Sequence, residues 1–201
     1  MPLLHRASQA FLVPLVLSLS ACGGGDGGGD SSAGSANQPS AATAPAATQL
    51  NARLTPFIGR WVACVQTGAS TSEKDDLLVS AGSGVDKVAI TRTSTQHTGV
   101  LDCTGQGLKL EEEQSELTLL GQTVVIGVVT LEKSSRTGRV IEYSYDLNGV
   151  MLAPTNSLPS PFLSVGLLPG STDKLVSGDE SLVDLNGNPI RLMPEVYLKQ
   201  P

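Results

Sequence analysis

The chain has 201 residues and a formal net charge of −6 at pH 7, and only 3% of its residues are aromatic. This acidic balance excludes the basic surface by which nucleic-acid-binding proteins hold their partners. The first element is an uncharged apolar stretch, residues 10–19, preceded by a short segment that carries Arg6. It is about half as long as a membrane-spanning helix and is typical of an export signal.

The apolar stretch ends in Leu19-Ser20-Ala21-Cys22, which resembles the lipobox of bacterial lipoproteins. The resemblance implies that residues 1–21 are a signal peptide and that lipid on Cys22 anchors the protein. An ordinary secretory signal, with Cys22 pairing in the mature protein, is the alternative. In enterobacterial lipoproteins an Asp directly after the cysteine retains the protein in the inner membrane. Gly23 occupies that position. We therefore expect the protein to be anchored at the periplasmic face of the outer membrane, with the periplasmic face of the inner membrane or the cell surface as alternatives.

Residues 22–49 have the composition of a flexible linker. From Gly23 to Thr48 the chain contains no large apolar side chain and is rich in Gly, Ser and Ala. Such a segment cannot bury enough apolar surface to offset the entropy of ordering it. We therefore expect a lipid-anchored spacer, followed by one folded domain over residues 50–201.

Residues 50–201 have the pattern of an all-β domain. Short runs rich in Val, Ile, Leu and Thr alternate with Gly, Asn, Asp, Ser and Pro, and no window keeps a helical period for three turns. The pattern predicts either a single antiparallel up-and-down β-barrel or a β-sandwich. Strands are predicted at residues 57–65, 76–80, 87–95, 99–103, 107–112, 116–120, 123–132, 140–145, 150–152, 162–168, 174–177, 181–184 and 196–199.

Two identical tetrapeptides predict hairpins. Asp146-Leu147-Asn148-Gly149 and Asp184-Leu185-Asn186-Gly187 both end in Asn-Gly, the pair best suited to the positive φ angles of a type I′ turn. We expect each to join two adjacent antiparallel strands.

The segment Phe57-Ile58-Gly59-Arg60-Trp61 resembles the first-strand Gly-x-Trp signature of the lipocalins and related calycin barrels. The resemblance favours the barrel over the sandwich and implies a lipocalin-like barrel in which Gly59 allows a bend and Trp61 plugs the closed end. It also implies an arginine from the last strand stacked on the tryptophan, for which Arg191 is the candidate.

Cys64 and Cys103 are the two cysteines that remain once Cys22 carries lipid. In an oxidising periplasm an even pair predicts a disulfide. A reactive thiol would need a nearby cation or a Cys-x-x-Cys pair, and neither cysteine has such a neighbour in the sequence.

No residue pattern predicts a catalytic site, a metal site or a cofactor. His97 lies in a polar segment and is expected to be a solvated loop histidine. Glu111, Glu112, Glu113 and Glu116 are expected to form a solvated strand end, because consecutive strand residues point to opposite faces and charges there discourage edge pairing.

The segment 178–182, Gly-Asp-Glu-Ser-Leu, is similar to the motif of Gly-Asp-Ser-Leu hydrolases, but a glutamate interrupts it. No histidine follows Ser181 to serve as base. Asp184, Asn186, Asn188 and Glu195 have part of the ligand spacing of a calcium loop, yet proline replaces the glycine that the loop needs.

These observations favour a non-catalytic envelope lipoprotein, a structural or protein-interaction module held to the membrane by its lipid and facing an envelope protein partner. The proline-rich connection 154–161 is either a plain connector or a docking loop. The alternative function is lipocalin-like binding of an apolar small molecule or lipid inside the barrel. An enzyme is the third and least favoured reading.

Overall fold

A computed structural model describes residues 49–157 and 160–201. The predicted signal peptide, Cys22 and nearly all of the predicted linker lie outside the described residues. No helix within the described ranges is long and apolar enough to cross a membrane. A 3-10 helix, η1 (Thr55–Phe57), precedes the strands, which are β1 (Gly59–Gln66), β2 (Thr71–Ala81), β3 (Lys87–Thr98), β4 (Leu108–Ile126), β5 (Val129–Tyr145), β6 (Met151–Ser157), β7 (Phe162–Leu167), β8 (Lys174–Ser177) and β9 (Tyr197–Lys199).

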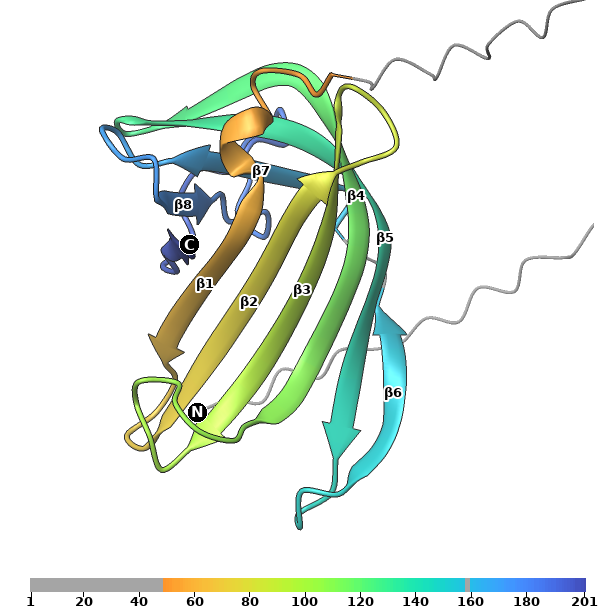
Figure 1. Cartoon of the computed structure of the whole chain (residues 1–201), viewed down its shortest axis with the longest axis vertical. Coiled ribbons are helices and arrows are strands. Elements are labelled where there is room, and N and C mark those ends of the chain that lie inside the picture. Colours follow the sequence, from red (N-terminus) through yellow and green to blue (C-terminus); the bar gives the residue numbers. More distant parts are fainter. Residues whose placement is uncertain (1–48, 158–159) are drawn as a thin grey trace, which may run out of the picture. The chain divides into compact units, whose positions relative to one another are not determined.

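The strands form a closed antiparallel β-barrel with up-and-down connectivity (Figure 1). β1 to β5 pair in chain order, β5 then pairs with β7, and β8 and β9 lead back to β1. This confirms the predicted barrel over the sandwich. β6 stands outside the eight-stranded ring and pairs with the distal part of β5.

The ring is hydrogen-bonded over only part of its height. β9 pairs with β1 at Trp61 and Val62, whereas β5 pairs with β7 at residues 132–135 and with β6 from Val140 onward. The strand pairing is therefore continuous at the level of Trp61. Beyond that level, toward Gln66, β1 pairs only with β2. β6 pairs only with β5.

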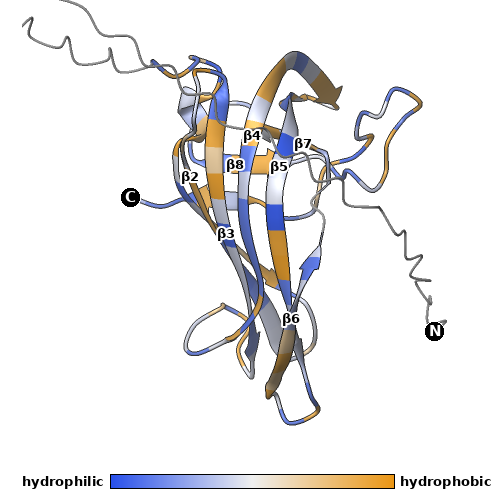
Figure 2. Ribbon diagram, turned by 90° about the vertical axis from the view of Figure 1, so that its right-hand side faces the viewer, coloured by the Kyte–Doolittle hydropathy of each residue, from blue (hydrophilic) through white to orange (hydrophobic). Residues whose placement is uncertain are grey.

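The core is built by the two-residue period of the strands, and Figure 2 shows polar and apolar residues mixed along each strand. Trp61 is fully buried, and its Nε1 donates a 2.7 Å hydrogen bond to the carbonyl oxygen of Phe57. Around it lie buried apolar side chains from η1 and four neighbouring strands. The members of this cluster are Leu54, Phe57, Trp61, Val79, Val88, Ile90, Leu117 and Leu175.

Gly59 has a positive φ and Trp61 is buried, but the side chain stacked on the tryptophan is not the expected arginine. Gly59 has a φ of +134°, and a Cβ there would lie 3.0 Å from Cε of Lys199. The Lys199 ammonium of β9 lies 5.0 Å from the centre of the Trp61 ring. Arg191, the expected cation, instead forms an ion pair with Asp179, so that prediction is wrong.

The two Asp-Leu-Asn-Gly segments form the same loop, though not a type I′ turn. Positive φ is confined to the glycines, Gly149 at +76° and Gly187 at +70°. In both, an aspartate carboxylate accepts hydrogen bonds from backbone N–H groups two and four residues later. These hydrogen bonds favour a loop longer than the two-residue type I′ turn. The first joins β5 to β6 as predicted. The second is flanked only by an isolated bridge between Val183 and Pro189, so the strand at 181–184 is wrong.

The predicted strands between residues 99 and 132 also need correction. Residues 99–103 form bends, and residues 108–120 belong to one long strand, β4, that continues beyond Gly121. The pairing of β4 with β5 shifts register between Leu119 and Gln122, so this glycine marks a β-bulge and not a turn. The true turn lies at Gly127 and Val128.

The predicted disulfide between Cys64 and Cys103 is present, and it holds the loop 99–107 against β1 and β2. Under this loop, Ser72 Oγ donates to the carbonyl oxygen of Val100 and accepts from the backbone N–H of Cys103. His97 lies there too and is only 3% exposed. The expectation of a solvated histidine is wrong, because the folded-back loop covers the end of β3.

Candidate functional site: a cavity inside the barrel

The barrel contains a cavity of about 570 Å³. This volume lies within the range of about 300 to 1,000 Å³ that is typical of small-molecule sites. Its wall comes from η1, from β1 to β5, from β7 to β9 and from the segment between β8 and β9.

One part of the wall is apolar. It coincides with the cluster around Trp61, where η1 lies against the barrel strands. Seven lining side chains of this part are buried, and they are Leu54, Phe57, Val79, Val88, Ile90, Leu117 and Leu175.

The rest of the wall is charged, and the same strands supply it. On β2, Glu73, Asp75, Leu77 and Val79 are two residues apart and all line the cavity. Because side chains alternate between the faces of a strand, all four point inward. β2 therefore presents carboxylates at one end of the cavity and apolar groups at the other.

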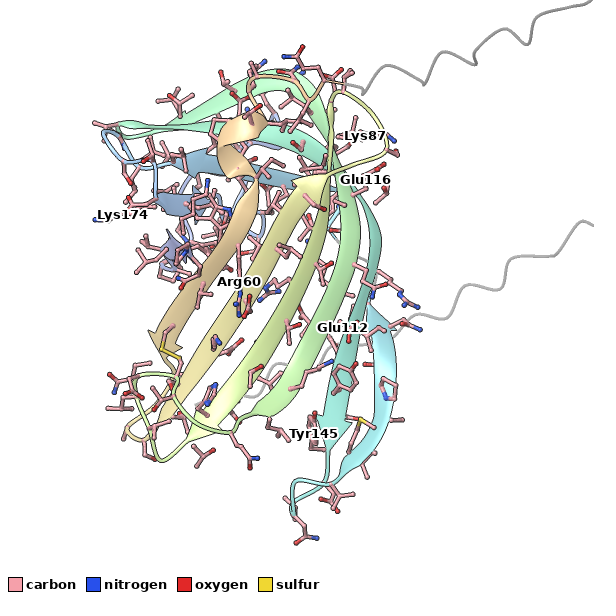
Figure 3. The ribbon with its side chains drawn as sticks, viewed as in Figure 1. Arg60, Lys87, Glu112, Glu116, Tyr145 and Lys174 are labelled. Atoms are coloured by element: carbon pink, nitrogen blue, oxygen red, sulfur yellow. A yellow bond between two sulfur atoms is a disulfide. The ribbon has the colours of Figure 1, made fainter. Side chains whose placement is uncertain are left out.

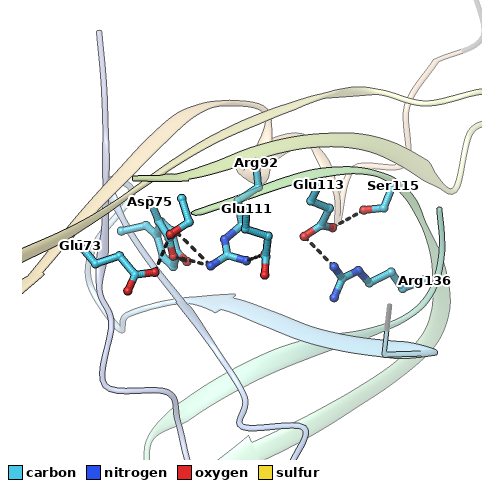
Figure 4. Close-up of polar contacts among 9 residues, drawn as sticks. Glu73, Asp75, Arg92, Glu111, Glu113, Ser115 and Arg136 are labelled. Atoms are coloured by element: carbon cyan, nitrogen blue, oxygen red, sulfur yellow. Dashed lines mark hydrogen bonds and ion pairs between the residues drawn. The ribbon is translucent and has the colours of Figure 1, made fainter. Parts of the chain in front are cut away.

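Arg92 of β3 is the centre of the first charged group (Figure 4). Its Nη2 lies 2.9 Å from Oδ2 of Asp75, and its Nη1 pairs with the Glu111 carboxylate. The hydroxyl of Tyr197 donates to the same Asp75 oxygen at 2.9 Å. This network joins four strands across the interior.

Burial and charge shift the pKa values of this group. Burial alone would lower the pKa of the Arg92 guanidinium, but the neighbouring charges of Asp75 and Glu111 outweigh it and raise that pKa. Burial raises the pKa of Glu111, and Arg92 opposes the shift. Burial, followed by the Asp75 charge, raises the pKa of the Tyr197 phenol. Tyr197 therefore stays a neutral hydrogen-bond donor.

Arg136 of β5 and Glu113 of β4 form a second ion pair, 2.6 Å between Nη2 and Oε2 (Figure 4). Ser115 Oγ donates to the other Glu113 oxygen. Glu73 accepts a 2.5 Å hydrogen bond from Ser94 Oγ but has no cation within ion-pair distance among the described residues.

The segment between β8 and β9 adds further carboxylates. Glu180 and Glu195 both line the cavity, and each has one buried carboxylate oxygen without a hydrogen-bond partner. Asp179 is held by Arg191 at 2.7 Å and by the Ser181 hydroxyl at 2.5 Å. Ser181 is therefore a hydrogen-bond donor to Asp179, which gives the segment 178–182 a structural role.

The sequence analysis placed the glutamates of β4 wrongly. Glu111 and Glu113 were expected at a solvated strand end, but the Glu113 side chain is only 5% exposed and Glu111 pairs with Arg92 inside the barrel. Asp75, Arg92 and Arg136 were missed entirely. The two-residue period of the strands could have identified them, because it places each of these residues on the same strand face as buried apolar side chains.

No group of three or more His, Cys, Asp or Glu side chains suited to a metal ion occurs in residues 49–157 and 160–201. Comparison of the chain with models of protein families, with curated proteins and with solved structures found no match.

Proposed function

We propose that this protein is a periplasm-facing outer-membrane lipoprotein whose barrel binds an apolar small molecule or lipid. The observation that carries the proposal is the cavity of about 570 Å³ with an apolar end. Each methylene group that moves from water into such a site contributes about 0.8 kcal/mol. A barrel whose interior were filled by its own side chains would not offer this volume.

The apolar cluster around Trp61 supports a lipocalin-like mode of binding. Trp61 and Phe57 are buried there and are hydrogen-bonded to each other, and we propose that the ligand enters from the charged part of the interior. The anchor on Cys22 and the linker would hold the barrel near the membrane.

The test is binding of N-phenyl-1-naphthylamine, a neutral apolar dye that fluoresces in dry sites. The protein is the chain from residue 22 onward with Cys22→Ser, exported behind an ordinary secretory signal so that no detergent is needed. Ala63 is buried and lines the cavity, so Ala63→Phe should reduce dye binding at least tenfold. Ala153→Phe adds the same ring on exposed β6 and should leave binding unchanged. Absence of dye binding to the parent chain would overturn the proposal.

A second function, protein interaction, is favoured by the hairpin of β5 and β6. Leu147, Val150, Met151 and Leu152 are all more than half exposed, and Figure 2 shows apolar residues at this end of β6. Exposed apolar groups on a strand with one unpaired edge are typical of docking surfaces. A photo-crosslinking residue at position 152 should capture an envelope protein in cells, while one at Asp173, on the exposed β7–β8 loop, should not.

A further inference from the structure

We infer that the ligand of the barrel is an amphiphile with an organic cation at one end and an apolar chain at the other. This inference rests on the proposed function and specifies the class of ligand. It is carried by the charge of the cavity wall, by the partners of the two arginines and by the position of the apolar end.

The cavity wall carries more negative than positive groups. Its lining includes the carboxylates of Glu73, Asp75, Glu113, Asp179, Glu180 and Glu195, but only the guanidinium groups of Arg92 and Arg136. At formal charges this is an excess of four negative charges. In an interior of low dielectric such an excess attracts a cation and repels an anion more strongly than at a surface.

The charges of the two arginines are already paired with carboxylates, although Nε of each is buried without a hydrogen-bond partner. Arg92 lies between Asp75 and Glu111, and Arg136 contacts Glu113. An anionic head group would have to displace one of these internal carboxylates, which would then be buried without a cation. Such a loss is costly in a protein interior.

Three carboxylates of the wall have no cation within ion-pair distance among residues 49–157 and 160–201. Glu73 accepts only the Ser94 hydroxyl, and Glu180 and Glu195 each have a buried oxygen without a donor. An ammonium group carries up to three N–H donors and would supply both the charge and the hydrogen bonds. Within the described residues, these are the groups that a ligand cation can satisfy without breaking an existing ion pair.

The apolar end lies at a suitable distance from Glu73. Glu73 and Val79 line the cavity from opposite ends of β2 and are six residues apart. At the rise per residue of a β-strand, this separation is about 20 Å. An elongated molecule could therefore place its cation near Glu73 and its chain among Val79, Val88 and Leu117.

Three probes with the same ten-carbon chain test the inference: decylammonium, decanol and decanoate. Their dissociation constants would be measured by calorimetry at pH 7 with the Cys22→Ser chain described above. We expect decylammonium to bind at least tenfold more tightly than decanol, and decanoate to bind more weakly than decanol. The double variant Glu180→Gln/Glu195→Gln should lose most of the preference for the cation. Glu112→Gln, which removes the same type of charge from an ion pair with Lys109 outside the cavity lining, should retain it.

The outcomes separate this inference from the proposed function. Equal or better binding of decanol or decanoate would overturn the cationic ligand and leave the binding barrel standing. Binding of none of the three probes would overturn both. Loss of the preference in Glu112→Gln, to the same extent as in the double variant, would mean that overall protein charge selects the ligand, and it would overturn the role of the cavity carboxylates. Near-ultraviolet circular dichroism of each variant verifies that the barrel is folded.

Discussion

The Arg136 guanidinium and the Glu113 carboxylate form an ion pair inside the barrel, with side chains only 12% and 5% exposed. They come from adjacent strands, β5 and β4, and β4 also carries the apolar Leu117 on the same inward face. Charged and apolar groups are therefore part of one continuous wall. The first prediction concerns the stability of this pair.

Arg136→Met should lower the free energy of unfolding by about 3 to 5 kcal/mol, because it leaves Glu113 buried without its cation. The double variant Arg136→Met/Glu113→Leu should recover most of that loss, since both charges are then absent. Urea unfolding of the single and double variants measures the coupling. A loss below about 1 kcal/mol in Arg136→Met would show that solvent reaches the pair.

Trp61→Ala should destabilise the barrel by about 3 to 5 kcal/mol, as truncation of large buried aromatic residues does. Trp61 is fully buried in the apolar cluster where η1 lies against the barrel strands. The matched control is Lys199→Met, which removes the cation over the ring and should cost about 1 kcal/mol. Equal losses in both variants, measured by urea unfolding, would contradict the assignment of Trp61 as the core residue.

Removing the disulfide with Cys64→Ala/Cys103→Ala should lower the free energy of unfolding by up to about 4 kcal/mol, because the two cysteines are 39 residues apart in the chain. The loop 99–107 should also leave the barrel wall more often. Hydrogen exchange should then speed up at His97 and Ser72 beneath the loop, and not at Trp61. Uniform acceleration across the barrel would contradict a local role for the bond.

Glu116 should contribute to acid unfolding. A hydrogen bond from Lys87, followed by one from the Ser83 backbone, lowers the pKa of Glu116 from about 4.5 to about 2, and Figure 3 shows Lys87 and Glu116 together at one end of the barrel. A carboxylate with a lowered pKa in the folded state stabilises the protein above its unfolded pKa. This stability is lost as the pH falls from about 4.5 toward 2.

In Glu116→Gln, the free energy of unfolding should depend less steeply on pH in that window. Lys87→Met should have a similar effect, and the double variant should add little to it. The measurement is a series of urea titrations between pH 2 and pH 6. Curves of equal slope for the parent chain and Glu116→Gln would show that the contact is too exposed to matter.

Composition and turn residues predicted an antiparallel barrel or sandwich, and the resemblance at residues 57–61 favoured the barrel, but none of them predicted its interior. The alternation of short apolar runs with Gly and Asn-Gly segments predicted antiparallel strands, and Gly59-Arg60-Trp61 predicted the buried tryptophan. Glu111 and Glu113 were misplaced because a charged residue in a strand is usually solvated. Their burial depends on Arg92 and Arg136, which lie on other strands, and strand register is a long-range property that the local pattern did not provide.

The position of His97 and the stacked cation could not be predicted for a similar reason. His97 is buried because a disulfide holds a distant loop over it. Lys199 stacks on Trp61 because β9 closes the ring beside β1, whereas Arg191 lies in the segment before that strand. Both outcomes depend on which strands become neighbours and not on the local sequence.

A titration with N-phenyl-1-naphthylamine followed by methyl NMR shows whether the barrel cavity binds a ligand. We predict saturable shifts at the methyl groups of Val79, Val88, Leu117 and Leu175, which line the cavity, with none at the exposed Leu147 and Leu185. Shifts confined to Leu147 and Leu152 on the hairpin of β5 and β6, or no saturable shifts at all, would contradict it.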